Sequence, residues 1–371
     1  MNSEKRKSLL RRFIAFLFKL MAFFSISALL LSISARFIPP GLSIIPSLFG
    51  LIFPYLFWFN LLVFILLIIK KYKRLIFIFI LPFVWSCFLI TDYYQFGFFN
   101  EKVPEQKTFK LMTFNVRLFN LYSWKNNLEW RDSIMNFIQE ENPDVLCLQE
   151  YYENTKGDFE TFNILTKELG YQYHHRYFPV IVKKFQRFGI ATFSRFPIVG
   201  KEQILFDKSS NMTLRSDIEV DSGVVIRVFN NHLESIRLSA EDLNYVSDVK
   251  VAEKEIERGK GIISRLRRAY RERQSQALII AEKISESIYP VLVCGDFNDV
   301  PVSYCYGTIS NNLNDAFIES GSGSGSTYPG KVHSFRIDYI LYSDSLKSYN
   351  THTYKSELSD HYPLISYIGY K

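Results

Sequence analysis

Three long apolar runs in the first 100 residues constrain what this chain can fold into more than any other feature of its sequence. The runs cover residues 13–33, 42–69 and 75–91. A helix needs about 20 apolar residues to cross the hydrocarbon core of a bilayer, within a range of about 17–25. A cleaved signal peptide would have a shorter apolar stretch, of about 7–15 residues, and two more such runs would not follow it. We therefore predict a transmembrane anchor of three helices over residues 1–100.

Basic residues flank these runs unevenly. Five lie before the first run, Arg36 alone follows it, and four lie between the second and third runs, within residues 70–74. The positive-inside rule then predicts a multi-pass protein of a bacterial inner (plasma) membrane, with residues after 100 on the periplasmic or extracytoplasmic side. The third run is the shortest, and the domain would lie in the cytoplasm if that run did not cross.

The net charge of +7 also belongs to this anchor. The first 100 residues hold 11 of the 44 Lys and Arg residues but 2 of the 37 acidic ones, which leaves 33 basic and 35 acidic residues in the rest. A net charge of about −2 gives the rest of the chain no basic footprint of the kind that binds duplex nucleic acid tightly.

A linker over residues 101–108 leads to a domain over 109–371, where apolar and polar residues alternate as in a soluble α/β protein. Helices are predicted at about 130–140 and 274–287, with a charged helical insertion at about 235–272. Each predicted strand runs into a polar loop that carries Asn, Glu, His or Asp. Such residues converge at one rim of an α/β sheet, where these folds place their ligands. Strands are predicted at 109–116, 145–150, 190–193, 224–233, 291–293 and 337–342.

Six short motifs follow these strands in a fixed order. They read TFN at 113–115, QE at 149–150, NHL at 231–233, GDFN at 295–298, RID at 336–338 and SDHYP at 359–363. Each alone has an ordinary structural explanation, but the set resembles the endonuclease/exonuclease/phosphatase superfamily over about 110–368. The resemblance implies a deoxyribonuclease I-like four-layer α/β sandwich, in which helices flank two packed mixed β-sheets. It also implies a metal-dependent hydrolase that acts on phosphoric ester bonds.

The resemblance further implies a metal site and a group that activates water. Glu150 would be the principal ligand of Mg²⁺ (or Mn²⁺), with Asn115 and possible help from Asp360. These are hard oxygen donors, as such ions require. Asp296 would orient or deprotonate the attacking water, and Asn298 would hold that water or the phosphate.

The same resemblance gives the histidines distinct roles. His361 would contact the phosphate and exchange protons, while Asp338 accepts its ring N–H and fixes the tautomer. His232 would lie near the leaving group. Arg187 and Arg195 are weaker candidates for contacts with the substrate phosphate.

Residues outside these motifs carry simpler expectations. We expect His174, His175, His333 and His352 at the surface or in loops, Asp315 as a structural support of the site, and Cys147 and Cys294 as buried free thiols. The insertion is either a solvated helix or a lid whose arginines, among them Arg265, Arg267, Arg268, Arg271 and Arg273, bind anionic groups.

The substrate remains open at this stage. A lipid headgroup or another small phosphodiester suits a membrane-anchored phosphoesterase. The alternatives are an exported or membrane-bound metal-dependent endonuclease or exonuclease, which would act on nucleic acid, and a non-catalytic binding protein on the same fold. No protein partner can be inferred.

Overall fold

The computed structural model describes residues 3–97, 101–105, 107–122, 127–207, 209–236, 253–330 and 334–370. The chain divides into two compact units. The first comprises Met1–Tyr93 with Val302–Tyr304, and the second comprises Tyr94–Pro301 with Cys305–Lys371. The two units are described separately below.

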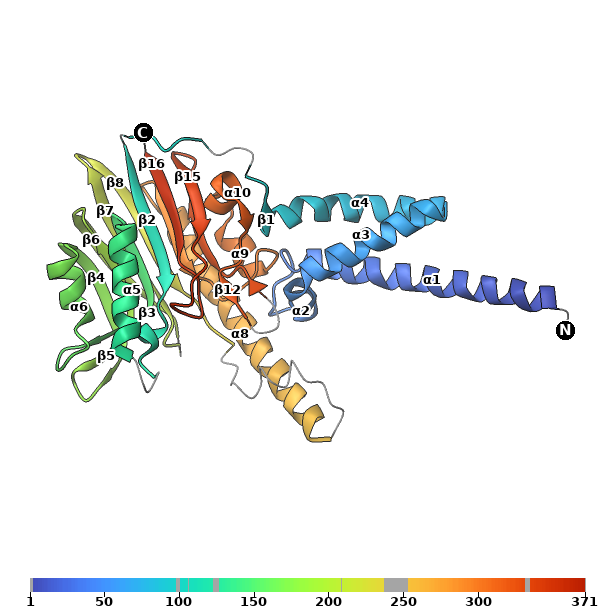
Figure 1. Cartoon of the computed structure of the whole chain (residues 1–371), viewed down its shortest axis with the longest axis horizontal. Coiled ribbons are helices and arrows are strands. Elements are labelled where there is room, and N and C mark those ends of the chain that lie inside the picture. The colour runs from blue at the N-terminus through green and yellow to red at the C-terminus, as the bar shows by residue number, and fades with distance from the viewer. Residues whose placement is uncertain are drawn as a thin grey trace. The chain divides into compact units, whose positions relative to one another are not determined.

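Four helices and a short 3₁₀ turn, η1 (Ile90–Asp92), form the first unit (Figure 1). The apolar run over 42–69 forms two helices that meet at Ile52, where the chain bends by 77°. Prolines explain the break, since Pro46 and Pro54 lie in the first turns of the two pieces, where a missing N–H costs nothing. The helices are α1 (Ser3–Ser34), α2 (Ile45–Leu51), α3 (Phe53–Ile69) and α4 (Lys73–Leu89).

Two of these helices are long and apolar enough to cross a membrane, and the number rises to three if the bent pair α2–α3 is one span. The α3–α4 turn lies beside α1, where Lys19 sits over the Tyr72 ring at 5.3 Å. At the other end Arg36 pairs with Asp92 at 3.1 Å. Between these ends Asn60 of α3 donates a hydrogen bond to the backbone carbonyl of Ser25 in α1. The apolar helices therefore pack as a bundle joined by a few polar contacts.

Two six-stranded sheets form the centre of the second unit. In the first, β2 and β3 run parallel and all other neighbours run antiparallel. Its strands, in spatial order, are β15 (Leu346–Thr353), β16 (Leu364–Tyr370), β2 (Thr108–Asn115), β3 (Val145–Asn154), β5 (Gln186–Ser194) and β4 (Tyr173–Val182).

The second sheet has the same mixed character, with β8 and β9 as its parallel pair. Its strands, in spatial order, are β10 (Asn314–Asp315), β14 (Asp338–Tyr342), β9 (Val291–Asp296), β8 (Val224–His232), β7 (Met212–Asp221) and β6 (Ile198–Leu205). Two small ribbons complete the unit. They pair β1 (Tyr94–Gln95) with β11 (Gly323–Ser324), and β12 (Tyr328–Pro329) with β13 (Ser334–Phe335).

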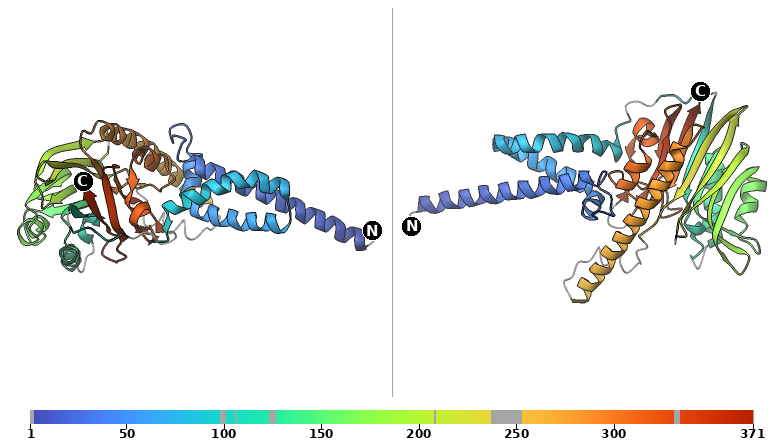
Figure 2. Two further views of the ribbon diagram at one scale, coloured as in Figure 1. Left: turned by 90° about the horizontal axis from the view of Figure 1, so that it is seen from above. Right: turned by 180° about the vertical axis from the view of Figure 1, so that it is seen from behind.

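Helices cover the outer face of each sheet, which gives the predicted four layers (Figures 1 and 2). One apolar cluster fills the space between the sheets, where Leu111 and Cys147 of one meet Val228 and Cys294 of the other. The first sheet carries α5 (Asn127–Glu141) and α6 (Thr161–Asn163), the latter continued by a π turn, η3 (Ile164–Glu168). The second carries α8 (Glu253–Ser285) and α9 (Tyr304–Ile309), and α10 (Ala316–Ser320) follows β10.

The long helix α8 differs from the prediction. The sequence suggested an insertion over 235–272 and a separate helix at 274–287, but one continuous helix covers both from Glu253 onward. Ala277 and Ile280 anchor its C-terminal half in the core against the second sheet. Residues 237–252 of the predicted insertion lie outside the described residues.

Candidate functional site

Strand register brings the motif residues to one end of the sandwich. Asn115 ends β2 beside Gln149 of β3, the residue before Glu150. His232 ends β8 opposite Asp296, which in turn pairs with Asp338 at the start of β14. The polar residues lie here because each strand is apolar until it leaves the core.

Gly295 explains how β8 and β9 come so close beneath the site. Its φ is +118°, and a Cβ there would lie 2.1 Å from the carbonyl oxygen of Asn231. Only glycine tolerates both conditions. The glycine of the GDFN motif is therefore a structural requirement for placing Asp296 beside His232.

Glu150 reaches the site through an irregularity in β3. The pairing of β3 with β5 shifts between Leu148 and Tyr151, and Glu150 has a φ of +49°. A bulge of this kind redirects a side chain, and strained backbone of this kind clusters at functional sites. Asn115 Nδ2 donates to Glu150 Oε1 at 3.3 Å and to Asp296 Oδ2 at 3.1 Å, so it joins the two carboxylates.

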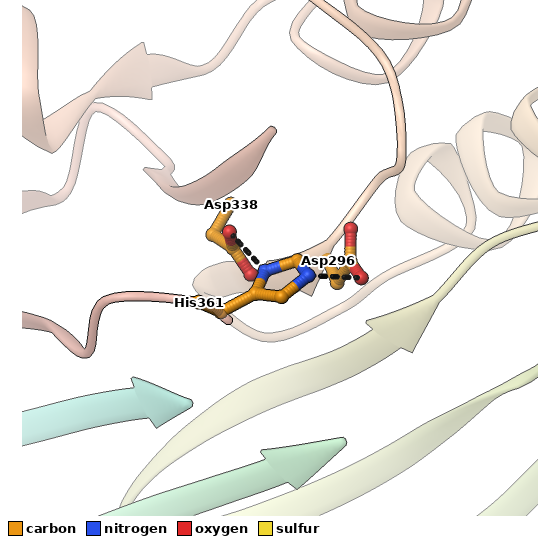
Figure 3. A group of neighbouring side chains, drawn as sticks. All are labelled: Asp296, Asp338 and His361. Carbon is orange, nitrogen blue, oxygen red and sulfur yellow. Dashed lines mark hydrogen bonds and ion pairs between the residues drawn. The ribbon is translucent and has the colours of Figure 1, made fainter. Parts of the chain in front are cut away.

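His361 forms the centre of a buried acidic cluster (Figure 3). Its Nδ1 lies 2.9 Å from Asp338 Oδ2, and its Nε2 lies 3.7 Å from Asp296 Oδ2. Burial alone would lower the pKa of His361, but the two carboxylates outweigh it and raise the pKa to about 10. His361 is therefore an imidazolium at neutral pH and donates a hydrogen bond to Asp338.

His232 has the opposite protonation state. Its Nε2 lies 3.9 Å from both Glu150 Oε1 and Asp296 Oδ2. Burial lowers its pKa and prevails over the attraction of Asp296. The site thus holds one neutral and one charged histidine, an arrangement that separates proton acceptor from proton donor.

Asp296 lies between the two histidines and is held by Asn298. Burial raises the pKa of Asp296 to about 6, and Asp338 adds to the effect while the histidines oppose it. The Asn298 backbone N–H donates to Asp296 Oδ1 at 2.8 Å, and its Nδ2 donates to Asp296 Oδ2 at 3.1 Å. Asn298 has a φ of +53°, a left-handed conformation that asparagine adopts more readily than most residues.

The donor chemistry of the site fits a divalent cation. Burial and then the nearby charge of Asp360 raise the pKa of Glu150, and a cation would relieve both effects. Glu150 and Asn115 would hold the ion with hard oxygen atoms, while Asp360 is partly engaged by Arg117 at 3.4 Å.

A second geometric grouping lies beside this donor set. Ligand atoms of Asp296, Asp338 and His361 lie within 4.8 Å of one another. Since His361 is protonated and bonded to Asp338, its ring nitrogens have no lone pair to give a metal ion. Glu150 and Asn115 are the better metal donors.

The two arginines proposed for phosphate binding do not join the site. Arg195 follows β5 next to Ser194, which pairs with Val145 at the opposite end of β3 from Glu150. It packs over the Tyr171 ring at 5.0 Å, so a role in phosphate contact is wrong for it. Arg187 lies at the nearer end, but a 3.0 Å ion pair with Glu153 engages its guanidinium.

Tyr328 and Arg117 are site residues that the sequence analysis missed. The Tyr328 ring packs edge-on against the His361 ring, with 5.1 Å between centroids. Burial, followed by the charge of Asp360, raises the pKa of Tyr328. The available signal was proximity in sequence, since Arg117 follows the TFN motif and Tyr328 precedes the RID motif.

Buried ion pairs fix the loops around the site. Arg273 of α8 has a 1% exposed side chain, and its Nε donates to Asp299 Oδ2 at 3.0 Å, next to Asn298. This arginine is therefore not available to an anionic ligand, as the lid hypothesis required. Arg336 pairs with Asp315, which also caps α10, so the structural role expected of Asp315 is confirmed.

The remaining histidines and cysteines follow the expectations in part. His175 is wrong as a surface residue, because it is buried between Ser216 and Gln203. His174 is half-buried beside Phe162, His352 is partly exposed, and His333 lies outside the described residues. Cys147 and Cys294 are buried free thiols, as predicted.

Solved structures with this fold share little sequence with the chain. An endonuclease/exonuclease/phosphatase from Bacteroides vulgatus matches with a TM-score of 0.51 and 19% identity, over 72% of this chain and 100% of that one. The human nocturnin catalytic domain with bound sulfate gives 0.51 and 22%, over 74% and 98%. A Beutenbergia cavernae DSM 12333 protein of the same description gives 0.50 and 17%, over 71% and 72%. At these identities the likeness shows the fold alone.

Sequence comparison adds the family. A search of curated protein sequences found no match to the chain. The sequence profile of the Endonuclease/Exonuclease/phosphatase family matches residues 112–361, which run from β2 to His361 and include all six motifs except the last two residues of the sixth, Tyr362 and Pro363. With two mixed sheets, flanking helices and this match over most of its length, the chain belongs to the endonuclease/exonuclease/phosphatase family.

Proposed function

We propose that the protein is a membrane-anchored, divalent-metal-dependent phosphoesterase that hydrolyses its substrate by attack of an activated water. Members of its family generally hydrolyse phosphoester bonds. The observation that carries the proposal is the His361–Asp338 pair beside Asp296, with Glu150 and Asn115 joined to the same carboxylate. A non-catalytic binding protein would have no need to keep every one of these groups.

The side chains divide the reaction between them. Asp296, whose pKa lies near 6, accepts the proton of the attacking water, and Asn298 keeps its carboxylate in place. The imidazolium of His361 donates to a phosphoryl oxygen, and Asp338 holds that ring in orientation. A Mg²⁺ or Mn²⁺ ion held by Glu150 and Asn115 would supply charge neutralisation to the phosphoryl group.

Features of the first unit support the membrane anchor and its orientation. The basic residues of the α3–α4 turn lie at the level of Lys19 on α1. At the C-terminal ends of α1 and α4, Arg36 pairs with Asp92. If α2–α3 counts as one span, three crossings put the positive residues inside and the catalytic domain on the extracytoplasmic side.

The experiment measures hydrolysis by the purified full-length protein. It compares bis-p-nitrophenyl phosphate, a small phosphodiester, with plasmid DNA in Mg²⁺, in Mn²⁺ and with EDTA. We expect metal-dependent release of p-nitrophenol and loss of at least 100-fold in kcat for His361→Ala and Glu150→Ala, since removing one acid–base or charge-stabilising group typically costs about 10²–10³.

His352→Ala is the matched control. This histidine lies in β15 and its Nδ1 contacts only the backbone carbonyl of Asn350, so its loss should leave kcat within about twofold. Activity on DNA with none on the diester would favour the nuclease alternative. Equal rates for wild type, His361→Ala and Glu150→Ala would refute the proposed site.

A further inference from the structure

A cleft of about 380 Å³ opens next to the candidate catalytic residues, and Glu150 and His232 form part of its wall. Its volume falls in the range of pockets that bind small ligands. Most of the remaining wall is apolar, with contributions from Leu118, Pro179, Val180, Val182, Phe188 and Met212.

One wall is the tip of the β4–β5 hairpin. Side chains alternate along β4, so Val180 and Val182 line the cleft while Ile181 between them does not. Val180 is 43% exposed and Val182 is 40% exposed, although both are apolar. Gly189 lies opposite on β5, where a Cβ would meet the carbonyl oxygen of Tyr177 at 1.9 Å, and this close approach keeps the strands together at the cleft.

Another wall comes from η2 (Arg117–Asn120), the turn after β2. All four of its residues have positive φ, with values of 45°, 54°, 55° and 53° in chain order. Such a run of non-glycine residues is strained and persists where the surroundings hold it. Phe119 is fully buried in the core, and this fixes Leu118 at the cleft.

The charge of the cleft indicates what it can bind. Among the described residues that line it, none is Lys or Arg, and Glu150 is the one acidic group. A groove that follows a nucleic-acid backbone needs basic side chains. An apolar group instead gains free energy by leaving water for such a wall.

From these observations we infer that the cleft binds an alkyl chain esterified to the scissile phosphate, which makes the substrate an amphiphilic phosphoester. The inference rests on the proposed function, because the cleft is continuous with Glu150 and His232. In the reaction the oxygen of water bonds to phosphorus, the P–O bond to one alcohol breaks, and that alcohol leaves with a proton.

The test uses soluble p-nitrophenyl alkyl phosphates with methyl, butyl, hexyl and octyl chains, below their micelle concentrations. The full-length protein is held in an amphipathic polymer so that no free detergent competes. Cleavage of either ester bond is followed by ³¹P NMR. We expect kcat/KM to rise about two- to fourfold per added methylene until the cleft is filled.

Variants on β4 locate the effect. Val180→Asp and Val182→Asp should reduce the hexyl-to-methyl ratio of kcat/KM to below about threefold. Ile181→Asp is the matched control, since this residue is 56% exposed on the same strand but does not line the cleft, and it should keep the full chain-length dependence. If the aspartate variants do not fold, Val180→Thr replaces them, because it keeps the volume of the side chain. It should lower the hexyl-to-methyl ratio in part.

The results that would overturn the inference can be distinguished from one another. Hydrolysis at equal kcat/KM for all chain lengths would remove the apolar subsite and leave the phosphoesterase intact. Hydrolysis of none of the esters, with metal present, would overturn the proposed function and the subsite together. A full loss of chain-length dependence in Ile181→Asp would also count against the cleft as the binding site.

Discussion

Replacing Asp338 by asparagine tests the role given to the His361–Asp338 pair. The change keeps the shape of the side chain but removes the charge next to the imidazole. At the observed 2.9 Å, two unit charges attract by about 6 kcal/mol at an effective dielectric constant of about 20, which corresponds to about 4 pKa units. The pKa of His361, raised to about 10 in the native protein, should therefore fall to about 6.

The activity of Asp338→Asn should fall together with the pKa of His361. At pH 7.5 most of the Asp338→Asn protein would hold a neutral His361 with an unfixed ring, and we expect kcat/KM to drop by about 10²–10⁴. Lowering the pH should restore part of the lost kcat/KM, because His361 is then protonated again. Asp344→Asn, in the turn after β14, is the matched control and should change kcat/KM by less than about twofold.

The assay combines the titration of His361 by ¹H–¹⁵N NMR with a pH profile of kcat/KM and a thermal unfolding curve. The stability of the native protein should also carry this signature. A histidine with a raised pKa stabilises the fold fully below its unfolded pKa of about 6.5, and loses that contribution as pH rises through about 10, by about 1.4 kcal/mol per unit at most. An unchanged pKa of His361 in a folded Asp338→Asn protein would refute this reasoning.

Three further predictions concern the scaffold. Burial lowers the pKa of His175 to about 4, so the free energy of unfolding should decrease as pH falls from about 6.5 to 4, with up to about 3 kcal/mol from this residue. His175→Gln should reduce that slope in thermal unfolding, and the rest of the slope should remain because the pKa of His174 is lowered to about 4 as well. Arg273→Met removes the buried ion pair with Asp299 and should destabilise the protein by about 3–5 kcal/mol, whereas Lys283→Met at an exposed pair should cost less than about 1 kcal/mol; similar melting temperatures would contradict the buried pair. Gly295→Ala should prevent stable folding, because its Cβ would clash with the backbone of Asn231. Gly223→Ala is the control: it has open space around it and should cost about 1 kcal/mol from its positive φ alone. Equal expression and equal melting temperatures of the two variants would contradict this prediction.

The sequence predicted the fold class well, because the fold depends on patterns that short segments carry. Strands such as β9 and β14 are mostly apolar, and β9 ends at a polar motif while β14 begins at one. Boundaries were less accurate. The predicted strand at 190–193 is the inner part of a longer β5, since its outer residues pack on partners that no local pattern reveals. Likewise the two predicted helical segments before and after residue 273 join into α8, because the buried Arg273 continues the helix and does not end it.

The candidate site shows the same division. Motif order was enough to select Asn115, Glu150, His232, Asp296 and His361, and the structure brings them within contact distance of one another or of a common carboxylate. Arg195 failed because its position depends on strand direction, since β5 runs antiparallel to β3 and carries its end away from the site. Tyr328 was missed because a ring contact with His361 has no sequence signature.

By itself, the sequence predicted the apolar helices and six strands from periodicity along the chain, and its motifs predicted the candidate catalytic groups through the resemblance to a known family. Tertiary structure alone decided the bulge that turns Glu150 into the site, the different protonation states of His232 and His361, and the apolar cleft between η2 and the β4–β5 hairpin. The physical reason is that pKa values and clefts depend on burial and on neighbours from distant segments, which exist only after the two sheets have packed.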